Sequence, residues 1–192
     1  MASGISIQEQ GIIRTKTAKP LLWVALAGMS MIFASLTSAY VVRQADSDWL
    51  SIELPVQFYY STAIIIVSSI TLWLADFSAK KDNQQGIKLW LFSTFILSLA
   101  FVYSQFDAYK ILMDQGLYFS GSGISSSFLY VLTIVHLAHV FGGNISLFVT
   151  SIKGLRGKYS SQDKLGIELA SWYWHYLTGV WMFLLMFLLY IK

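Results

Sequence analysis

Five long apolar stretches constrain this chain more than any other feature of its sequence. They cover about residues 21–43, 54–76, 87–108, 126–152 and 168–191. A helix that crosses the hydrocarbon core of a bilayer needs roughly 20 residues of this kind. Hydrophobic residues make up 56% of the chain and charged residues only 12%, a composition that does not suit a water-soluble domain. The sequence therefore predicts an all-α membrane protein, a bundle of five transmembrane helices.

The segments before the first and fourth spans indicate where those spans begin. Residues 1–20 contain no run of seven apolar residues, so we expect no signal peptide. We interpret residues 1–19 as an N-terminal segment and residues 20–192 as the membrane domain. The Gly- and Ser-rich sequence before the fourth span favours a turn, and Ser126 or Ser127 is the expected N-cap of that helix.

Basic residues alternate between the connections, and this pattern predicts an orientation. The N-terminal segment and the second and fourth connections together hold ten of the 13 Lys and Arg residues. The remaining three, Arg43, Lys110 and Lys192, lie at the other ends of the spans. Because basic loops stay on the cytoplasmic side, we expect a cytoplasmic N-terminus and a periplasmic C-terminus. The expected location is a bacterial cytoplasmic (inner) membrane.

Few ionisable side chains lie within the spans, and such groups usually face the protein interior. His136 and His139 share one face of the fourth span, near its middle. Glu168, Trp172 and His175 form a stripe on the fifth span, and we expect the two polar stripes to meet. Small residues beyond the two histidines would allow a neighbouring helix to approach closely: Gly142, Gly143 and Ser146.

The residues alone leave several interpretations of the histidines open. They could be neutral side chains hydrogen-bonded between helices, or His139 and His175 could ligate a haem. A copper or zinc site from the three histidines would lack carboxylate or thiolate support, because the chain contains no cysteine. A proton path would need a series of carboxylates, and the first span contains none.

Motifs in the second half of the chain occur in an order that is specific to one family. The fourth span contains H-x-x-H-V-x-x-G from His136 to Gly143, and the fifth begins with E-x-x-x-W-Y-W-H from Glu168 to His175. A basic loop joins the two. In this order the motifs resemble subunit III of the haem-copper terminal oxidases, in the five-helix bacterial form. The resemblance covers roughly residues 20–190.

The resemblance implies an accessory role in a respiratory complex. In this family haem and copper belong to partner subunits, so the resemblance implies that this chain binds no cofactor and contains no catalytic residue. It implies a proton-pumping cytochrome c oxidase that reduces oxygen to water, with subunit I as the main contact and the other oxidase subunits as further partners. Membership of a respiratory supercomplex is compatible with this role, and we expect the isolated chain to depend on subunit I for stability.

The resemblance also implies a V-shaped cleft that holds structural phospholipids. We hypothesise that His136, Lys153 and His175 line or border this cleft, with Glu168 orienting His175. Lys153 lies at the expected cytoplasmic end of the fourth span, where a lipid phosphate needs a cation. The full set of predicted lipid-cleft or interhelical polar residues is His136, His139, Lys153, Glu168, Trp174 and His175.

Two positions depart from the family pattern, and three rival functions remain. Many family members carry a glutamate in the first span, where the matching position here is Ser30. The family sequence W-Y-W-H-F-V-D ends in aspartate, which Thr178 replaces here. A quinol oxidase or a nitric oxide reductase has an equivalent subunit. The other rivals are a stand-alone haem-binding membrane cytochrome that uses His139 and His175, and a small transporter.

Overall fold

The predicted all-helical architecture is confirmed. The computed structural model describes residues 7–45, 49, 52–121, 123–161 and 163–191, with side chains from residue 16 onward. The described residues form five helices that are long and apolar enough to cross a membrane, the first of them from Lys16 onward. The helices are α1 (Ile7–Arg43), α2 (Gln57–Lys80), α3 (Gln84–Asp114), α4 (Ile124–Leu155) and α5 (Leu165–Tyr190).

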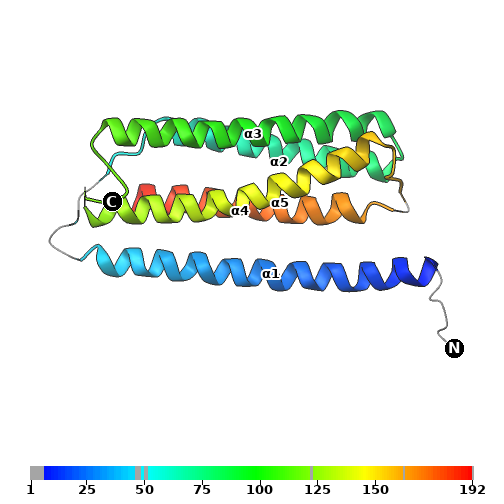
Figure 1. The fold of residues 1–192 in the computed structure, drawn as a ribbon, viewed down its shortest axis with the longest axis horizontal. Helices are drawn as coiled ribbons and strands as arrows, with labels where there is room; N and C mark the ends of the chain where they lie inside the picture. The colour runs from blue at the N-terminus through cyan, green and yellow to red at the C-terminus, as the bar shows by residue number, and fades with distance from the viewer. Residues whose placement is uncertain (1–6, 46–48, 50–51, 122, 162, 192) are drawn as a thin grey trace.

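Four of the helices form a closed ring, and α1 lies beside it (Figure 1). In the ring, α2 packs against α3 and α5, and α4 packs against the same two helices. In the described residues, α1 contacts α4 and α5. The core of the ring is apolar and combines residues from all four helices, among them Ile65, Leu72, Phe101, Val140 and Leu177.

The α1 helix contributes a narrow seam to this packing. Its fully buried large side chains, Leu26, Phe33 and Tyr40, are spaced seven residues apart. Seven residues are close to two helical turns, so the three side chains follow one line along the helix. Most of the remaining surface of α1 is exposed and apolar, as at Val24 and Met31, which suits contact with lipid or with another membrane protein.

The α4 helix begins earlier than the sequence indicated. Its first residue is Ile124, and the residue before it, Gly123, has a φ of 123° that favours glycine. The prediction of Ser126 or Ser127 as the N-cap was wrong. The Ser126 hydroxyl donates to the Gly123 carbonyl at 2.8 Å, and the Ser127 hydroxyl donates to the Phe119 carbonyl at 2.8 Å. Both side chains therefore bond carbonyl groups that precede the helix.

The close approach expected beside the histidine pair is confirmed. A Cβ atom at Gly143 would lie 3.1 Å from the ring of Trp174, so a larger residue would require this ring to shift by a few tenths of an ångström. At the neighbouring Gly142 the nearest atom, the Tyr173 hydroxyl oxygen, would be 3.6 Å away, which is an ordinary contact. Gly143 therefore sets the separation of the two helices that carry the family motifs.

Candidate functional site

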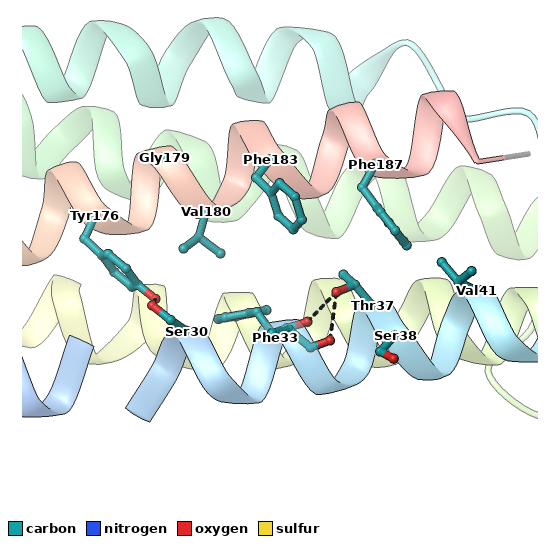
Figure 2. Close-up of a pocket in the computed structure, with 11 residues that line it drawn as sticks. Ser30, Phe33, Thr37, Ser38, Val41, Tyr176, Gly179, Val180, Phe183 and Phe187 are labelled. Atoms are coloured by element: carbon teal, nitrogen blue, oxygen red, sulfur yellow. Dashed lines mark hydrogen bonds between the residues drawn. The ribbon is translucent and has the colours of Figure 1, made fainter. Parts of the chain in front are cut away.

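An apolar groove separates α1 from α5 (Figure 2). Its volume is about 660 Å³, which lies in the range of sites that hold small molecules. The α5 helix contributes Gly179, whose lack of a side chain widens the groove. The other lining residues are mostly apolar or aromatic: Ser30, Phe33, Ala34, Thr37, Ser38 and Val41 from α1, and Tyr176, Val180, Phe183 and Phe187 from α5.

The hydroxyl groups of Ser30, Tyr176 and Thr37 in the groove are bonded within the protein. At one end the Ser30 Oγ lies 2.8 Å from the Tyr176 hydroxyl and also donates to the Leu26 carbonyl at 2.9 Å. Further along, the Thr37 hydroxyl donates to the carbonyl of Phe33 at 2.8 Å. With these groups satisfied, the groove offers mainly hydrocarbon and ring surfaces to an occupant.

Ser30, the position that matches the family glutamate in the sequence analysis, therefore lies at one end of this groove. Ser30 bonds Tyr176 from α5, which places a neutral hydroxyl pair between the two helices. Thr178, at the position of the family aspartate, is 6% exposed and donates its hydroxyl to the Trp174 carbonyl at 3.0 Å. The Ser30 hydroxyl is thus bonded at an exposed position between α1 and α5, whereas the Thr178 hydroxyl is bonded inside the ring.

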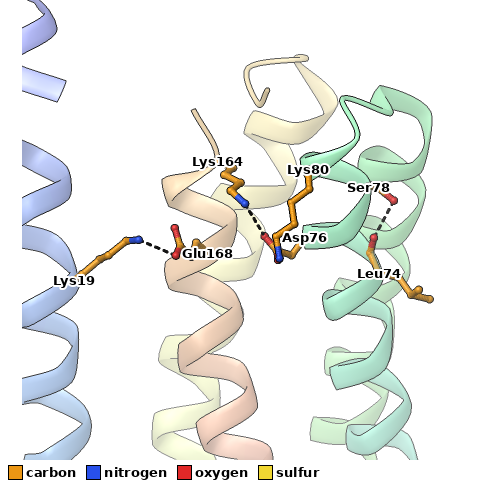
Figure 3. A network of polar contacts seen from close by, with 7 residues as sticks. All are labelled: Lys19, Leu74, Asp76, Ser78, Lys80, Lys164 and Glu168. Carbon is orange, nitrogen blue, oxygen red and sulfur yellow. Dashed lines mark hydrogen bonds and ion pairs between the residues drawn. The ribbon is translucent and has the colours of Figure 1, made fainter. Parts of the chain in front are cut away.

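Charged residues join α1 to α5 beyond the Ser30–Tyr176 pair. Lys19 Nζ lies 2.7 Å from Glu168 Oε1 (Figure 3). It also lies 5.5 Å from the ring centroid of Trp172. Trp23 packs against Trp172 with a centroid distance of 5.6 Å. We expected Glu168 to orient His175, but the structure pairs Glu168 with Lys19 of α1. The cause is the position of Glu168 on the α5 face that looks toward α1.

The W-Y-W-H motif on α5 binds α2 as well as α4. Trp174 Nε1 donates to Ser68 Oγ at 3.0 Å, and His175 Nδ1 forms a short hydrogen bond with Ser69 Oγ. The Tyr173 hydroxyl donates to the carbonyl of His139 on α4 at 3.1 Å. The sequence analysis did not identify Ser68 and Ser69. The signal was available, since two adjacent serines in the middle of an apolar span indicate a polar contact between helices.

The two histidines of α4 occupy different environments. His136 is 1% exposed and stacks on Trp181 of α5 at 5.2 Å between ring centroids. Among the described residues neither of its ring nitrogens has a hydrogen-bond partner. His139 donates from Nδ1 to the Val135 carbonyl at 2.7 Å, and its ring lies 5.7 Å from that of Phe33 on α1.

The structure does not bring the predicted polar residues together as one cluster. His139 packs toward α1, whereas His175 bonds α2, so the two side chains do not face each other as ligands of one haem would. In the part of the chain that the structure describes, no group of three His, Asp or Glu residues could hold a metal ion. None of the three histidines lines the α1–α5 groove.

Lys153 borders two recesses at the end of α4. One has a volume of about 240 Å³ and also touches Lys158, Tyr159 and Asp163. The other has a volume of about 370 Å³ and follows α4 from Lys153 to Gly142, between α4 and the start of α5. A cation therefore stands at the end of a partly apolar strip, which is the arrangement that an anionic lipid requires.

Together these features define a class of protein. The polar residues of the two motifs connect helices to one another, and a recess with apolar walls lies between α1 and α5. Such a bundle suits a membrane-embedded subunit whose polar groups serve its assembly.

Comparison with known proteins identifies the family. The sequence model of the family described as "Cytochrome c oxidase subunit III" matches residues 50–192. The chain is 31% identical to "Probable cytochrome c oxidase subunit 3" of Nocardia farcinica over 169 residues, 84% of this chain and 80% of that protein. It is 28% identical to the protein of the same description from Mycobacterium tuberculosis over 177 residues, 90% of this chain and 86% of that one. The chain belongs to the cytochrome c oxidase subunit III family, as its motifs indicated.

Proposed function

We propose that this chain is the accessory subunit III of a proton-pumping cytochrome c oxidase in a bacterial cytoplasmic membrane. In this proposal its partner subunits hold haem and copper and reduce oxygen to water, while this chain binds neither. Its main contact is subunit I. The basic residues at one end of the bundle face the cytoplasm, which places the N-terminus inside and the C-terminus in the periplasm.

The contacts that the family motifs make between helices support this role. Trp174 and His175 bond α2, and Tyr173 bonds α4. Residues that mark the family therefore hold the bundle together, as expected for a subunit that stabilises a neighbour. The exposed apolar surface of α1 and the outer faces of the ring supply area for contact with other membrane subunits.

A second part of the proposal is that the chain holds structural phospholipids. The α1–α5 groove has the volume and the apolar lining to accept acyl chains. Lys153 and Lys158 border a recess at one end of the bundle, where they can bind the phosphate of an anionic headgroup. Of the residues first predicted for this purpose, Lys153 is retained, while His136 and His175 act between helices.

The experiment that tests the oxidase role is a mild purification through a tag on this chain, followed by a visible spectrum and identification of the co-purified subunits. Recovery of larger subunits with haem a absorbance is the expected result. Haem b together with such subunits would indicate a quinol oxidase or a nitric oxide reductase. A chain recovered alone would contradict the proposal, and a haem spectrum in that sample would indicate a stand-alone cytochrome.

The lipid proposal can be tested with two glycines that have open space around them. A Cβ atom at Gly179 or at Gly28 would meet no atom within 4 Å, so leucine at either position fits the bundle. Gly179 lines the groove and Gly28 does not. We expect Gly179→Leu to lower the number of lipids retained in native mass spectrometry, and Gly28→Leu to leave it unchanged. Equal lipid retention in both variants and in the unaltered protein would exclude the groove as a lipid site.

A further inference from the structure

Buried polar atoms without a hydrogen-bond partner gather between α3 and α4. Five such atoms in the described residues lie here, namely Oε1 of Gln105, the hydroxyl of Tyr109, Oγ of Ser125 and both ring nitrogens of His136; others belong to Trp49, Asp76 and Gln84. None of the four residues between α3 and α4 is more than 8% exposed. A buried polar atom that lacks a partner destabilises a protein by about 1–3 kcal/mol, and lipid chains cannot supply the missing bond.

Ring contacts show that these atoms follow one another along a single interface. The ring centroids of Phe101 and His136 are 6.3 Å apart, and those of Tyr109 and Tyr130 are 5.5 Å apart. As the residue number increases along α3, the residue number of the contacting side chain on α4 decreases, as in antiparallel helices. Gln105 lies one turn from both Phe101 and Tyr109 and so shares their face of α3, where its amide nitrogen bonds Ser61 of α2.

The row of atoms extends from one end of the bundle to its middle. Ser125 lies in the first turn of α4, next to the connection from α3. Eleven residues separate it from His136, and at 1.5 Å per residue they span about 16 Å. This length is about half of a hydrocarbon core of roughly 30 Å.

Neighbouring protein groups are already bonded elsewhere. The hydroxyl protons of Thr133 and Tyr130 are donated to the Leu129 carbonyl at 2.8 Å and to the Leu117 carbonyl at 2.9 Å. The Thr133 oxygen can accept from the Tyr109 hydroxyl, which leaves the Tyr109 oxygen as an acceptor. The amide nitrogen of Gln105 donates to Ser61 Oγ at 2.8 Å, whereas the side-chain oxygen of Gln105 has no hydrogen-bond donor among the described residues. The partner of the unbonded atoms must therefore be small, able both to donate and to accept, and able to enter a protein interior.

We propose that α3 and α4 bind a chain of internal water molecules that runs from Ser125 to His136. A buried water makes about three hydrogen bonds, and hydrogen-bonded oxygen atoms lie about 2.8 Å apart, so about five waters would span the distance of about 16 Å and serve the five atoms. A neutral imidazole can donate from one ring nitrogen and accept at the other, and His136 is thus bonded through water. The proposal concerns this interface alone and does not depend on the oxidase role.

An apolar wall ends the chain of waters at His136. Trp181 of α5 stacks on the imidazole, and Phe33 of α1 and Phe101 of α3 have ring centroids 6.1 and 6.3 Å from it. These rings offer no strong hydrogen-bonding group toward the other half of the bundle. The proposed chain of waters therefore ends at His136.

Radiolytic labelling tests this inference on the unaltered protein in the assembly with which it purifies. X-ray exposure generates hydroxyl radicals from bound water, and mass spectrometry locates the oxidised side chains. Trp181 and Trp174 form a matched pair, because both lie on α5, both are 1% exposed, and both donate from Nε1 to a hydroxyl group. We expect Trp181, which stacks on His136, to be oxidised several-fold faster than Trp174. Equal rates would overturn the proposal.

A pair of variants on α3 provides a second test. Gln105→Leu removes an acceptor from the chain of waters, so it should lower the oxidation rate of Trp181 toward that of Trp174. Thr94→Val is the control, since Thr94 is also buried on α3 but bonds Thr71 of α2. This control should leave both rates unchanged. An unaltered Trp181 rate in Gln105→Leu would show that no water is held at Gln105.

Discussion

The ring of α2 to α5 and the single helix α1 are both apolar, yet they are held in different ways. In its most apolar window 17% of the α1 residues are buried, compared with 44% in α4 and 28% in α3. The ring uses close packing around Gly143 and hydrogen bonds between helices. The α1 helix uses a seam of widely spaced side chains and a terminal ion pair. Hydrophobicity therefore places all five helices in the membrane but does not decide how tightly they pack.

This difference follows from the solvent. In a bilayer the lipid is as apolar as the side chains, so helices associate through close packing and polar contacts. The α1 helix makes few close contacts and few polar contacts with the ring, so a groove remains between α1 and α5. Four predictions test how α1 and the ring are held, from the largest expected effect to the smallest.

The largest effect is expected at Trp174, which belongs to the ring. Trp174→Ala removes a fully buried ring and the hydrogen bond to Ser68, and should lower the free energy of unfolding by on the order of 3 kcal/mol. The matched variant on α1 is Trp23→Ala, where the side chain is 59% exposed and packs on Trp172, with an expected loss of about 1 kcal/mol or less. Thermal unfolding of the two variants measures the contrast. Similar losses would mean that α1 is as tightly held as the ring.

The second prediction concerns the closest approach of two helices. A Cβ atom at Gly143 would lie 3.1 Å from Trp174, so Gly143→Ala should destabilise the bundle by about 1–3 kcal/mol through overpacking. Gly142→Ala is the control, because its nearest neighbour would be 3.6 Å away, and it should be neutral or stabilising since alanine favours a helix. The melting temperatures of the two variants measure this difference in stability. An unaffected Gly143→Ala would show that the Trp174 ring can move aside.

The third prediction tests the ion pair that joins α1 to α5. Glu168→Gln removes the charge that Lys19 contacts. Both side chains are partly exposed, so the expected loss in global stability is below about 1 kcal/mol. Hydrogen exchange should nevertheless become faster in the first described turns of α1 and stay unchanged in α4. The control is Lys80→Gln, which removes a contact with Asp76 inside α2 and should not affect α1. If exchange in α1 is the same in both variants, the pair does not hold that helix.

The smallest effect is a pH dependence in the loops of the ring. The Ser161 amide donates to Asp82 Oδ1 at 2.6 Å, and hydrogen bonds from Ser161 lower the pKa of the Asp82 carboxyl below its ordinary 3.8. A lowered pKa in the folded state means that the stabilising contribution is present above pH 3.8 and is lost as the pH falls through the lowered value.

Amide exchange at Ser161 measures this effect. At neutral pH the amide should be better protected in the unaltered protein than in Asp82→Asn, which keeps an acceptor but cannot titrate. The difference should vanish as the pH falls below the lowered pKa. A difference that persists in acid would assign the protection to the shape of the loop and not to the charge on Asp82.

Several features of the fold and site were predictable because they depend on local sequence. Apolar run length located all five helices, and a small residue beside the histidine pair predicted the approach of α5 at Gly143. The motifs identified the family correctly. The start of α4 was placed too late because serine hydroxyls can donate backward to carbonyls as well as cap a helix, and the sequence does not distinguish the two uses.

Other features were not predictable because they depend on which helix lies next to which. The spacing of Glu168 and His175 placed them on one stripe, but the structure directs Glu168 to Lys19 of α1 and His175 to Ser69 of α2. A stripe on a helix about 10 Å wide can face two neighbours at once. The rotation of α5 relative to those neighbours decides which contact each side chain makes.

The sequence by itself determined that this chain has five segments long and apolar enough to cross a membrane and that it belongs to the subunit III family. Both properties reside in the composition of single segments and in the order of short motifs, which do not require knowledge of distant contacts. Only the tertiary structure decided that α1 stands beside a closed ring, that a groove separates it from α5, and that unbonded polar atoms gather between α3 and α4. These depend on the mutual rotation and spacing of helices, which packing and hydrogen bonding set jointly across the whole bundle.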